Sequence, residues 1–202
     1  MGQPADTVLV GDDVGVLRCI RRPQDKTWNE SSVLCQNGDM DKDRGIVSMS
    51  QACCLGGDTA FVAVGRRNGT TSIHNADSCI QVASFGTKNH RGDGVASVAW
   101  QESSEGGLIE AQECGSIQRH SPTAAVSAWD QWEGREVFKC SSGVQCTALH
   151  SDGVQLALGC AGAELAVLDL SSGARSPHAA TLPIWHVGCS LFDLWCALSS
   201  CG

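Results

Sequence analysis

The stretch VQLALGCAGAELAVLDLSSG, residues 154–173, contains two short apolar runs on either side of a turn made of small residues. Short runs of this kind, bounded by turn residues, predict two β-strands joined as a hairpin. A single hairpin is only marginally stable in water. The fold therefore depends on whether this unit recurs along the chain.

Three further copies of the unit are present. They are TVLVGDDVGVLRCI at residues 7–20, AFVAVGRRNGTTSIHN at residues 60–75 and, in a weaker form, GLIEAQECGSIQRHS at residues 107–121. With Gly11, Gly65, Ala111 and Gly159 taken as equivalent, the intervals are 54, 46 and 48 residues. Repeats of roughly 40–50 residues typically build one four-stranded β-propeller blade each.

The segments around the hairpins supply the other strands of each unit. Upstream lie GIVSMSQACCLGGD, GVASVAWQESSEGG and GVQCTALHSDG, in which apolar and polar residues alternate before a glycine turn, and downstream lie CIQVASF and EVFKC. No segment of ten or more residues has helical periodicity, and the 5 prolines fall in expected loops. We therefore predict an all-β fold with four strands in each unit.

Several motifs, in their order along the chain, resemble the WD40 propeller family. In ELAVLDLSSG, Asp169 takes the Asp place of the Trp-Asp dipeptide, and LPIWHVG follows it. VLVGDDVGVLRCIRR, a degenerate second blade and ATLPIW resemble the nucleolar WD-repeat factors that assist assembly of the large (60S) ribosomal subunit. The resemblance covers roughly residues 7–185. It implies a seven-bladed WD40-type propeller, of which about four blades are present.

The repeats predict one domain, a partial WD40 propeller over residues 1–185. The approximate blades are residues 1–45, 46–95, 96–135 and 136–180. Residues 186–202, HVGCSLFDLWCALSSCG, have no blade-like hairpin and no basic run. We interpret them as a non-repeat apolar tail that arises from a gene-model artefact or an alternative transcript. A genuine closed ring of four blades is the competing interpretation.

Composition narrows the function classes. The 202 residues carry 22 Asp plus Glu against 14 Lys plus Arg, a net charge of -8, which argues against a surface that binds nucleic acid throughout. The first residues, MGQPADTVLVGDD, lack the basic and apolar regions of a signal peptide. No window approaches the roughly 18 consecutive apolar residues of a membrane span. We therefore expect a soluble protein inside the cell.

The cysteines predict reduced, mostly buried thiols. The chain has 12 in 202 residues, about 6%, below the ~8–10% of disulfide scaffolds. Cys19, Cys146 and Cys160 lie inside strand-like runs, where cysteine acts as a small apolar residue. Structural zinc sites usually contain paired ligands two to four residues apart, and the chain has no CxxC. We predict neither a metal nor a cofactor.

The resemblance implies a non-catalytic role. Its relatives dock on pre-60S ribosomal particles in the nucleolus, in contact with proteins and rRNA, and work alongside an AAA-type ATPase. No GxSxG motif surrounds a serine in the chain. The sequence therefore predicts a nucleolar or nuclear assembly factor in rRNA processing, without a membrane or small-molecule substrate. The alternative is another intracellular WD40 adaptor, of the chromatin or ubiquitin-ligase type.

The hairpin tips supply the candidate binding site, because in a propeller they line one rim. Mixed charge at these tips suits protein docking better than a phosphate track. Trp129-Asp130 is the one literal Trp-Asp dipeptide, and its tryptophan has either a structural or a partner-binding role. We expect reversal of both tip arginines to weaken assembly without unfolding. The candidate partner-binding residues are Asp12, Asp13, Arg66, Arg67, Glu113, Trp129 and Trp132.

Overall fold

The computed structural model of the chain is built from strands. It describes residues 6–22, 32–37, 45–50, 53–54, 59–86, 93–101, 107–123, 132–150, 153–161 and 164–173. These residues contain fifteen strands and no helix. Accordingly, none of them forms a helix long and apolar enough to cross a membrane. The predicted all-β class is confirmed.

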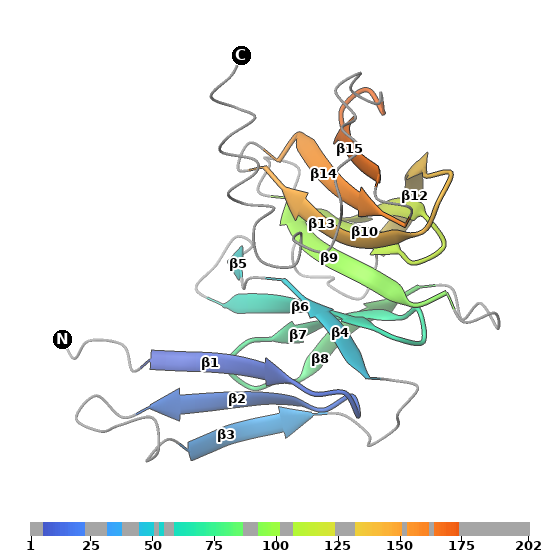
Figure 1. Cartoon of the computed structure of the whole chain (residues 1–202). Coiled ribbons are helices and arrows are strands. Elements are labelled where there is room, and N and C mark those ends of the chain that lie inside the picture. Colours follow the sequence, from blue (N-terminus) through green and yellow to red (C-terminus); the bar gives the residue numbers. More distant parts are fainter. Residues whose placement is uncertain are drawn as a thin grey trace.

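The strands form four antiparallel sheets that follow one another along the chain (Figure 1). The first sheet contains β1 (Asp6–Gly11), β2 (Leu17–Arg22) and β3 (Ser32–Asn37). The second contains β4 (Ile46–Met49), β6 (Ala60–Arg66), β7 (Thr71–Asn75) and β8 (Gln81–Phe85), with β5 (Cys53–Cys54) also paired to β6. The third contains β9 (Val95–Gln101), β10 (Gly107–Gln112), β11 (Ser116–Pro122) and β12 (Trp132–Lys139). The fourth contains β13 (Val144–Leu149), β14 (Gln155–Cys160) and β15 (Glu164–Asp169).

The first strands of successive sheets lie beside one another. β4 contacts β9, and β9 contacts β13. Hydroxyl groups bridge these strands: Ser48 Oγ accepts the Val98 N–H at 3.1 Å, and Thr147 Oγ1 lies 2.8 Å from Ser97 Oγ. In Figure 1 the first and fourth sheets lie at opposite ends of this series. The described sheets therefore do not close into a four-membered ring.

The sheets approach each other where a strand has a small residue. A Cβ atom on Gly11 of β1 would lie 2.8 Å from Ile46 Cγ2, and one on Gly65 of β6 would lie 2.5 Å from Val95 Cγ1. Both distances are shorter than carbon–carbon contact allows. The aligned residue of the third sheet, Ala111, shares a buried cluster with Val144. Two of the four aligned positions thus contact the first residue of the following sheet directly, and the third lies in the same cluster as that residue.

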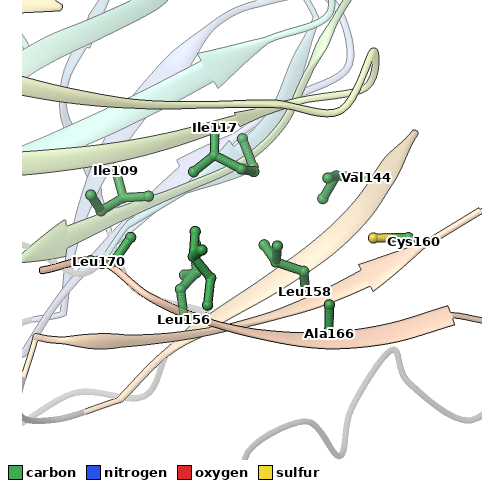
Figure 2. Close-up of a cluster of buried hydrophobic side chains, with 10 residues drawn as sticks. Ile109, Ile117, Val144, Leu156, Leu158, Cys160, Ala166 and Leu170 are labelled. Carbon is green, nitrogen blue, oxygen red and sulfur yellow. The ribbon is translucent and has the colours of Figure 1, made fainter. Parts of the chain in front are cut away.

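Buried side chains fill the space between each pair of consecutive sheets. Figure 2 shows the third of these clusters, in which Ile109 and Ile117 of the third sheet face Leu156 and Leu158 of the fourth. Burial of one such side chain contributes about 1.5–3 kcal/mol. Between the second and third sheets the cluster contains Phe61, Ala63, Ile73, Ala83, Val95, Val98, Trp100 and Leu108. Between the first and second it contains Leu17, Cys19, Val62, Val64 and Cys79.

Polar contacts also join the first sheet to the second. The Ile46 N–H donates to the Asp12 carbonyl oxygen at 2.9 Å. The side chain of Arg66 is buried, and its Nη1 donates to the Gly15 carbonyl oxygen at 2.8 Å. That bond joins the hairpin turn of the first sheet to the end of β6. Arg66 is therefore part of the packing between sheets, and its neighbour Arg67 is exposed.

The approach of Val95 to Gly65 predicts non-additive effects of mutation. We expect Gly65→Ala to lower the free energy of unfolding by about 1–3 kcal/mol, because the new methyl group overlaps Val95. Val95→Ala leaves a cavity that this methyl group can partly fill. The double variant should therefore be more stable than the sum of the single losses by about 1 kcal/mol. Urea denaturation of all four proteins measures the coupling, and simple additivity would contradict direct packing of the two residues.

The two adjacent arginines predict opposite results in a stability experiment. Arg66→Ala removes a buried donor and leaves the Gly15 carbonyl oxygen without this bond, so the free energy of unfolding should fall by about 1–3 kcal/mol. Arg67→Ala is the matched control, because the Arg67 side chain is exposed, and its loss should stay within about 0.5 kcal/mol. Thermal and urea unfolding compare the two variants. Equal losses would be inconsistent with the burial of Arg66.

Candidate protein-docking rim

Three hairpin turns share one geometry: those between β1 and β2, between β6 and β7, and between β10 and β11. They span residues 12–15, 66–69 and 112–115. In each, the glycine N–H donates to the carbonyl oxygen of the first turn residue, at 3.2, 3.1 and 2.9 Å. The glycines, Gly15, Gly69 and Gly115, have φ of 92°, 79° and 92°, a left-handed conformation that glycine adopts without strain. The predicted tips are therefore equivalent structures in successive sheets.

Each turn exposes its second residue. Asp13, Arg67 and Glu113 are exposed, and Ala161 is exposed at the same place after β14. The first residue of each turn faces the interior instead, since Arg66, Gln112 and Cys160 are buried and Asp12 is half-buried. We call the four exposed residues the rim. It presents a negative, a positive, a negative and an apolar side chain in sequence order.

Backbone contacts hold the rim in place. Three rim residues donate their N–H groups to glycine carbonyl oxygens just before the first strand of their own sheet: Arg67 to Gly45 at 2.9 Å, Glu113 to Gly94 at 2.8 Å and Ala161 to Gly143 at 2.7 Å. Two of these glycines, Gly94 and Gly143, also press on the preceding sheet. A Cβ on Gly94 would lie 2.8 Å from the Arg67 carbonyl oxygen, and one on Gly143 would lie 2.5 Å from that of Glu113. Three of the four rim residues, Arg67, Glu113 and Ala161, are thus connected through a continuous series of backbone contacts.

A hollow of about 580 Å³ opens beside the rim. Residues at the starts of β9 and β13, one residue of β4 and two rim residues form its wall. More of its exposed lining is polar than apolar, since Glu113 and Gln145 stand among the aliphatic side chains, and Val47 in it is 41% exposed. A partner segment that offers both hydrogen-bonding and apolar groups fits such a lining. The lining residues are Val47, Val95, Ala96, Glu113, Gly143, Val144, Gln145 and Ala161.

The structure separates the predicted rim residues into two groups. Asp13, Arg67 and Glu113 are exposed at the rim, where the sequence analysis placed them. The prediction for Arg66 is wrong, because its side chain is buried against the first sheet. Reversal of its charge would therefore disturb the fold and does not test docking. Arg66 is the last residue of β6, a strand buried on both faces, and Arg67 is the first residue beyond it in the exposed turn, so the two arginines have different roles.

Asp12 stabilises its own turn. Its carboxylate accepts the N–H groups of Val16 at 2.7 Å and Val14 at 3.2 Å, and the Arg18 guanidinium donates to it at 2.6 Å. Partial burial raises the pKa of Asp12, but the Val16 and Arg18 hydrogen bonds and the Arg18 charge outweigh it and hold the pKa below its usual value. The carboxylate is therefore engaged within the turn, which distinguishes it from the neighbouring Asp13.

Asp169, the aspartate of the predicted blade ending, has a comparable local role. Its Oδ1 accepts hydrogen bonds from the Ser171 hydroxyl, the Ser171 N–H and the Ser172 N–H. These bonds, the Ser171 hydroxyl first, lower the pKa of Asp169. An Asx turn of this kind stops the strand. Asp169 thus ends β15 in a turn.

Of the two tryptophans in the candidate site, the structure describes only Trp132. Trp132 begins β12 and is half-buried. Its ring stacks on Phe85 with centroids 5.6 Å apart and lies 6.2 Å from the Trp100 ring. It packs against the cluster between the second and third sheets, which is a structural role, and its contact with a partner stays a prediction. Trp129 lies outside the described residues.

Two buried histidines engage polar groups inside the fold. His74 is bonded through Nε2 to Ser72 Oγ at 2.8 Å and through Nδ1 to the Cys79 carbonyl oxygen at 3.0 Å. Burial lowers the pKa of His74. His120 Nε2 lies 3.3 Å from the buried carboxylate of Glu110. The described residues contain no group of three or more His, Cys, Asp or Glu that could hold a metal ion.

The sequence analysis missed the glycines that support the rim. Gly45, Gly94 and Gly143 recur at an interval of 49 residues, each before a β-branched residue that begins a sheet. This interval is more regular than the hairpin intervals of 54, 46 and 48 residues. A search for residues that recur at a constant interval would therefore have found these three glycines. Their function depends on contacts with another sheet, which the repeat pattern alone does not describe.

Comparison with known proteins supports the fold. In sequence, the chain matches no protein-family profile and no curated protein. In structure, it is similar to the β-propeller domain of Cps50 (Swd1) from Myceliophteria thermophila, with a TM-score of 0.65, 10% identity and coverage of 88% of this chain and 53% of that chain. It is also similar to the computationally designed Ika8 protein, with a TM-score of 0.57, 12% identity and coverage of 89% and 48%.

The chain thus spans about half the length of each of these solved structures. Its four successive antiparallel sheets correspond to propeller blades. The predicted fold class is confirmed: the chain has a β-propeller fold with about four blades.

Proposed function

We propose that the protein is a non-catalytic scaffold that binds a protein partner through the rim and the adjacent hollow. The observation that carries this proposal is the series of backbone contacts that fixes Arg67, Glu113 and Ala161 while their side chains remain outside. A preorganised surface loses little conformational entropy when it binds. Alternating charges beside a hollow of mixed polar and apolar lining give such a surface both orientation and contact area.

The finer proposal is a role in assembly of the large ribosomal subunit. It rests on the order of the segments VLVGDDVGVLRCIRR and ATLPIW and on the intervening blades, which resemble the nucleolar WD-repeat factors of that process. The first segment forms the hairpin of β1 and β2, whose turn carries Asp13. We propose pre-60S particle proteins as partners, with rRNA nearby and an AAA-type ATPase acting at a later step. The proposed site of action is the nucleolus.

The rim proposal predicts a specific loss of assembly. The variant Arg67→Glu/Glu113→Lys reverses two exposed rim charges of opposite sign, and co-sedimentation of the tagged endogenous product with large-subunit precursors should fall about tenfold, equivalent to about 1.4 kcal/mol. The matched control, Glu133→Lys/Arg135→Glu, reverses exposed charges on β12 away from the rim. The control should co-sediment normally. Equal losses in the two variants would contradict docking through the rim.

The same purification tests the choice of partner. Large-subunit precursor proteins and an AAA-type ATPase among the bound material support the assembly role. Chromatin or ubiquitin-ligase components without ribosomal material would replace it with the general WD40 adaptor. Loss of those components in the rim variant would still support the rim as the docking surface.

A further inference from the structure

We propose that Cys140 and Cys160 form a reversible disulfide that joins the third and fourth sheets. Their sulfur atoms lie 4.0 Å apart. Cys140 follows β12, the last strand of the third sheet, and Cys160 ends β14, the central strand of the fourth sheet. The proposal goes beyond the rim function, because it concerns a covalent modification between two blades.

The backbone holds each cysteine in place. The Cys140 N–H donates to the Gly115 carbonyl oxygen at 2.9 Å. Cys160 is paired with Val144 on one side and Glu164 on the other. Cys160 is 1% exposed and belongs to the cluster between the two sheets, and Cys140 packs against that cluster. Figure 2 shows the Cys160 sulfur at one end of the cluster, beside Val144.

Disulfide bonds are about 2.05 Å long, so rotation of the side chains must bring the sulfurs about 2 Å closer.

The chemistry requires a disulfide as oxidant, and oxidised glutathione is the class we name. Cys140 is half-buried and within reach of solvent. Its thiolate attacks one glutathione sulfur, the glutathione S–S bond breaks, and one glutathione thiolate leaves. The Cys160 thiolate then attacks the Cys140 sulfur and releases the second glutathione thiolate. The two protons lost by the cysteines pass to the two glutathione thiolates, so two protein thiols are oxidised and one glutathione disulfide is reduced.

Two neighbouring thiols provide controls. Cys146 is opposite Gly159 in the β13–β14 pair and packs with Ala157 and Leu165, on the side of the fourth sheet that faces away from the third. Burial raises the pKa of the Cys146 thiol, which reduces its thiolate fraction. Cys114 lies in the turn before β11, where the Lys139 ammonium group is 3.4 Å from its sulfur. Neither thiol is placed in the cluster that contains Cys160.

The bond would stabilise one end of the rim. Cys160 immediately precedes Ala161, whose N–H donates to the Gly143 carbonyl oxygen. Ala161 and Gly143 both line the hollow. A covalent link between the end of β12 and the end of β14 closes a short loop and restricts the unfolded chain. The oxidised protein should therefore have a higher midpoint of thermal unfolding than the reduced protein. Reduction should restore the original midpoint.

The test uses the purified full chain equilibrated in glutathione buffers from fully reducing to fully oxidising. Trypsin leaves Cys140, Cys146 and Cys160 in one peptide, residues 140–175, so a second cleavage before Asp152 is needed to separate Cys160. Differential alkylation and fragment mass spectra then identify the linked pair. We expect a Cys140–Cys160 bond that dithiothreitol removes, and a rise in the unfolding midpoint of roughly 6–12 °C.

The variants make the result specific. Cys140→Ser and Cys160→Ala should each abolish the bond and the rise in the midpoint, and Cys140→Ser does so without altering the buried side chain. Cys146→Ala and Cys114→Ser should retain both. Absence of the bond in fully oxidising buffer would overturn the proposal, as would linkage of Cys160 to Cys146 or of Cys140 to Cys114. A bond that leaves the midpoint unchanged would overturn its stabilising effect on the two sheets.

Discussion

The structure depends on the close contact between a small residue in one sheet and the first β-branched residue of the next. Gly65 meets Val95, and Gly11 meets Ile46, at distances that leave no room for a Cβ atom. Protein interiors tolerate little overlap, so these positions set how near two sheets can come. The buried clusters between the sheets assemble only because this approach is possible.

The same approach determines the rim. When two sheets come close enough to bury the side chains between them, the glycine just before the first strand of the second sheet contacts the hairpin turn of the first. Gly94 contacts the Arg67 carbonyl oxygen in this way, and Gly143 contacts the Glu113 carbonyl oxygen. The rim is therefore a consequence of packing and needs no separate stabilising device. Its exposed side chains are free to vary in charge, because none of the backbone contacts uses them. Propellers support many functions for this reason: the scaffold and the binding side chains are specified by different atoms.

Much of the architecture could be predicted from short-range patterns. Alternating apolar residues and glycine turns specify hairpins locally, so the strands around residues 60–75 and 107–121 were identifiable from the sequence. The rim was only partly predictable. Arg66 and Arg67 are adjacent and chemically identical, yet one lies against Gly15 of another sheet and the other is exposed. The burial of Trp132 likewise depends on Phe85 and Trp100, which come from other strands and are distant in the sequence.

The sequence by itself determined the all-β class, the repeating hairpins and the glycines that their turns require, because each depends on residues close together in the chain. Tertiary structure alone decided which turn residues are exposed, which sheets share a cluster and which thiols lie together. Cys140 and Cys160 are 20 positions apart in the sequence, and 4.0 Å separates their sulfurs. That proximity follows from the packing of the two sheets, because each cysteine is held by the backbone of its own sheet and only the contact between the sheets brings their sulfurs together.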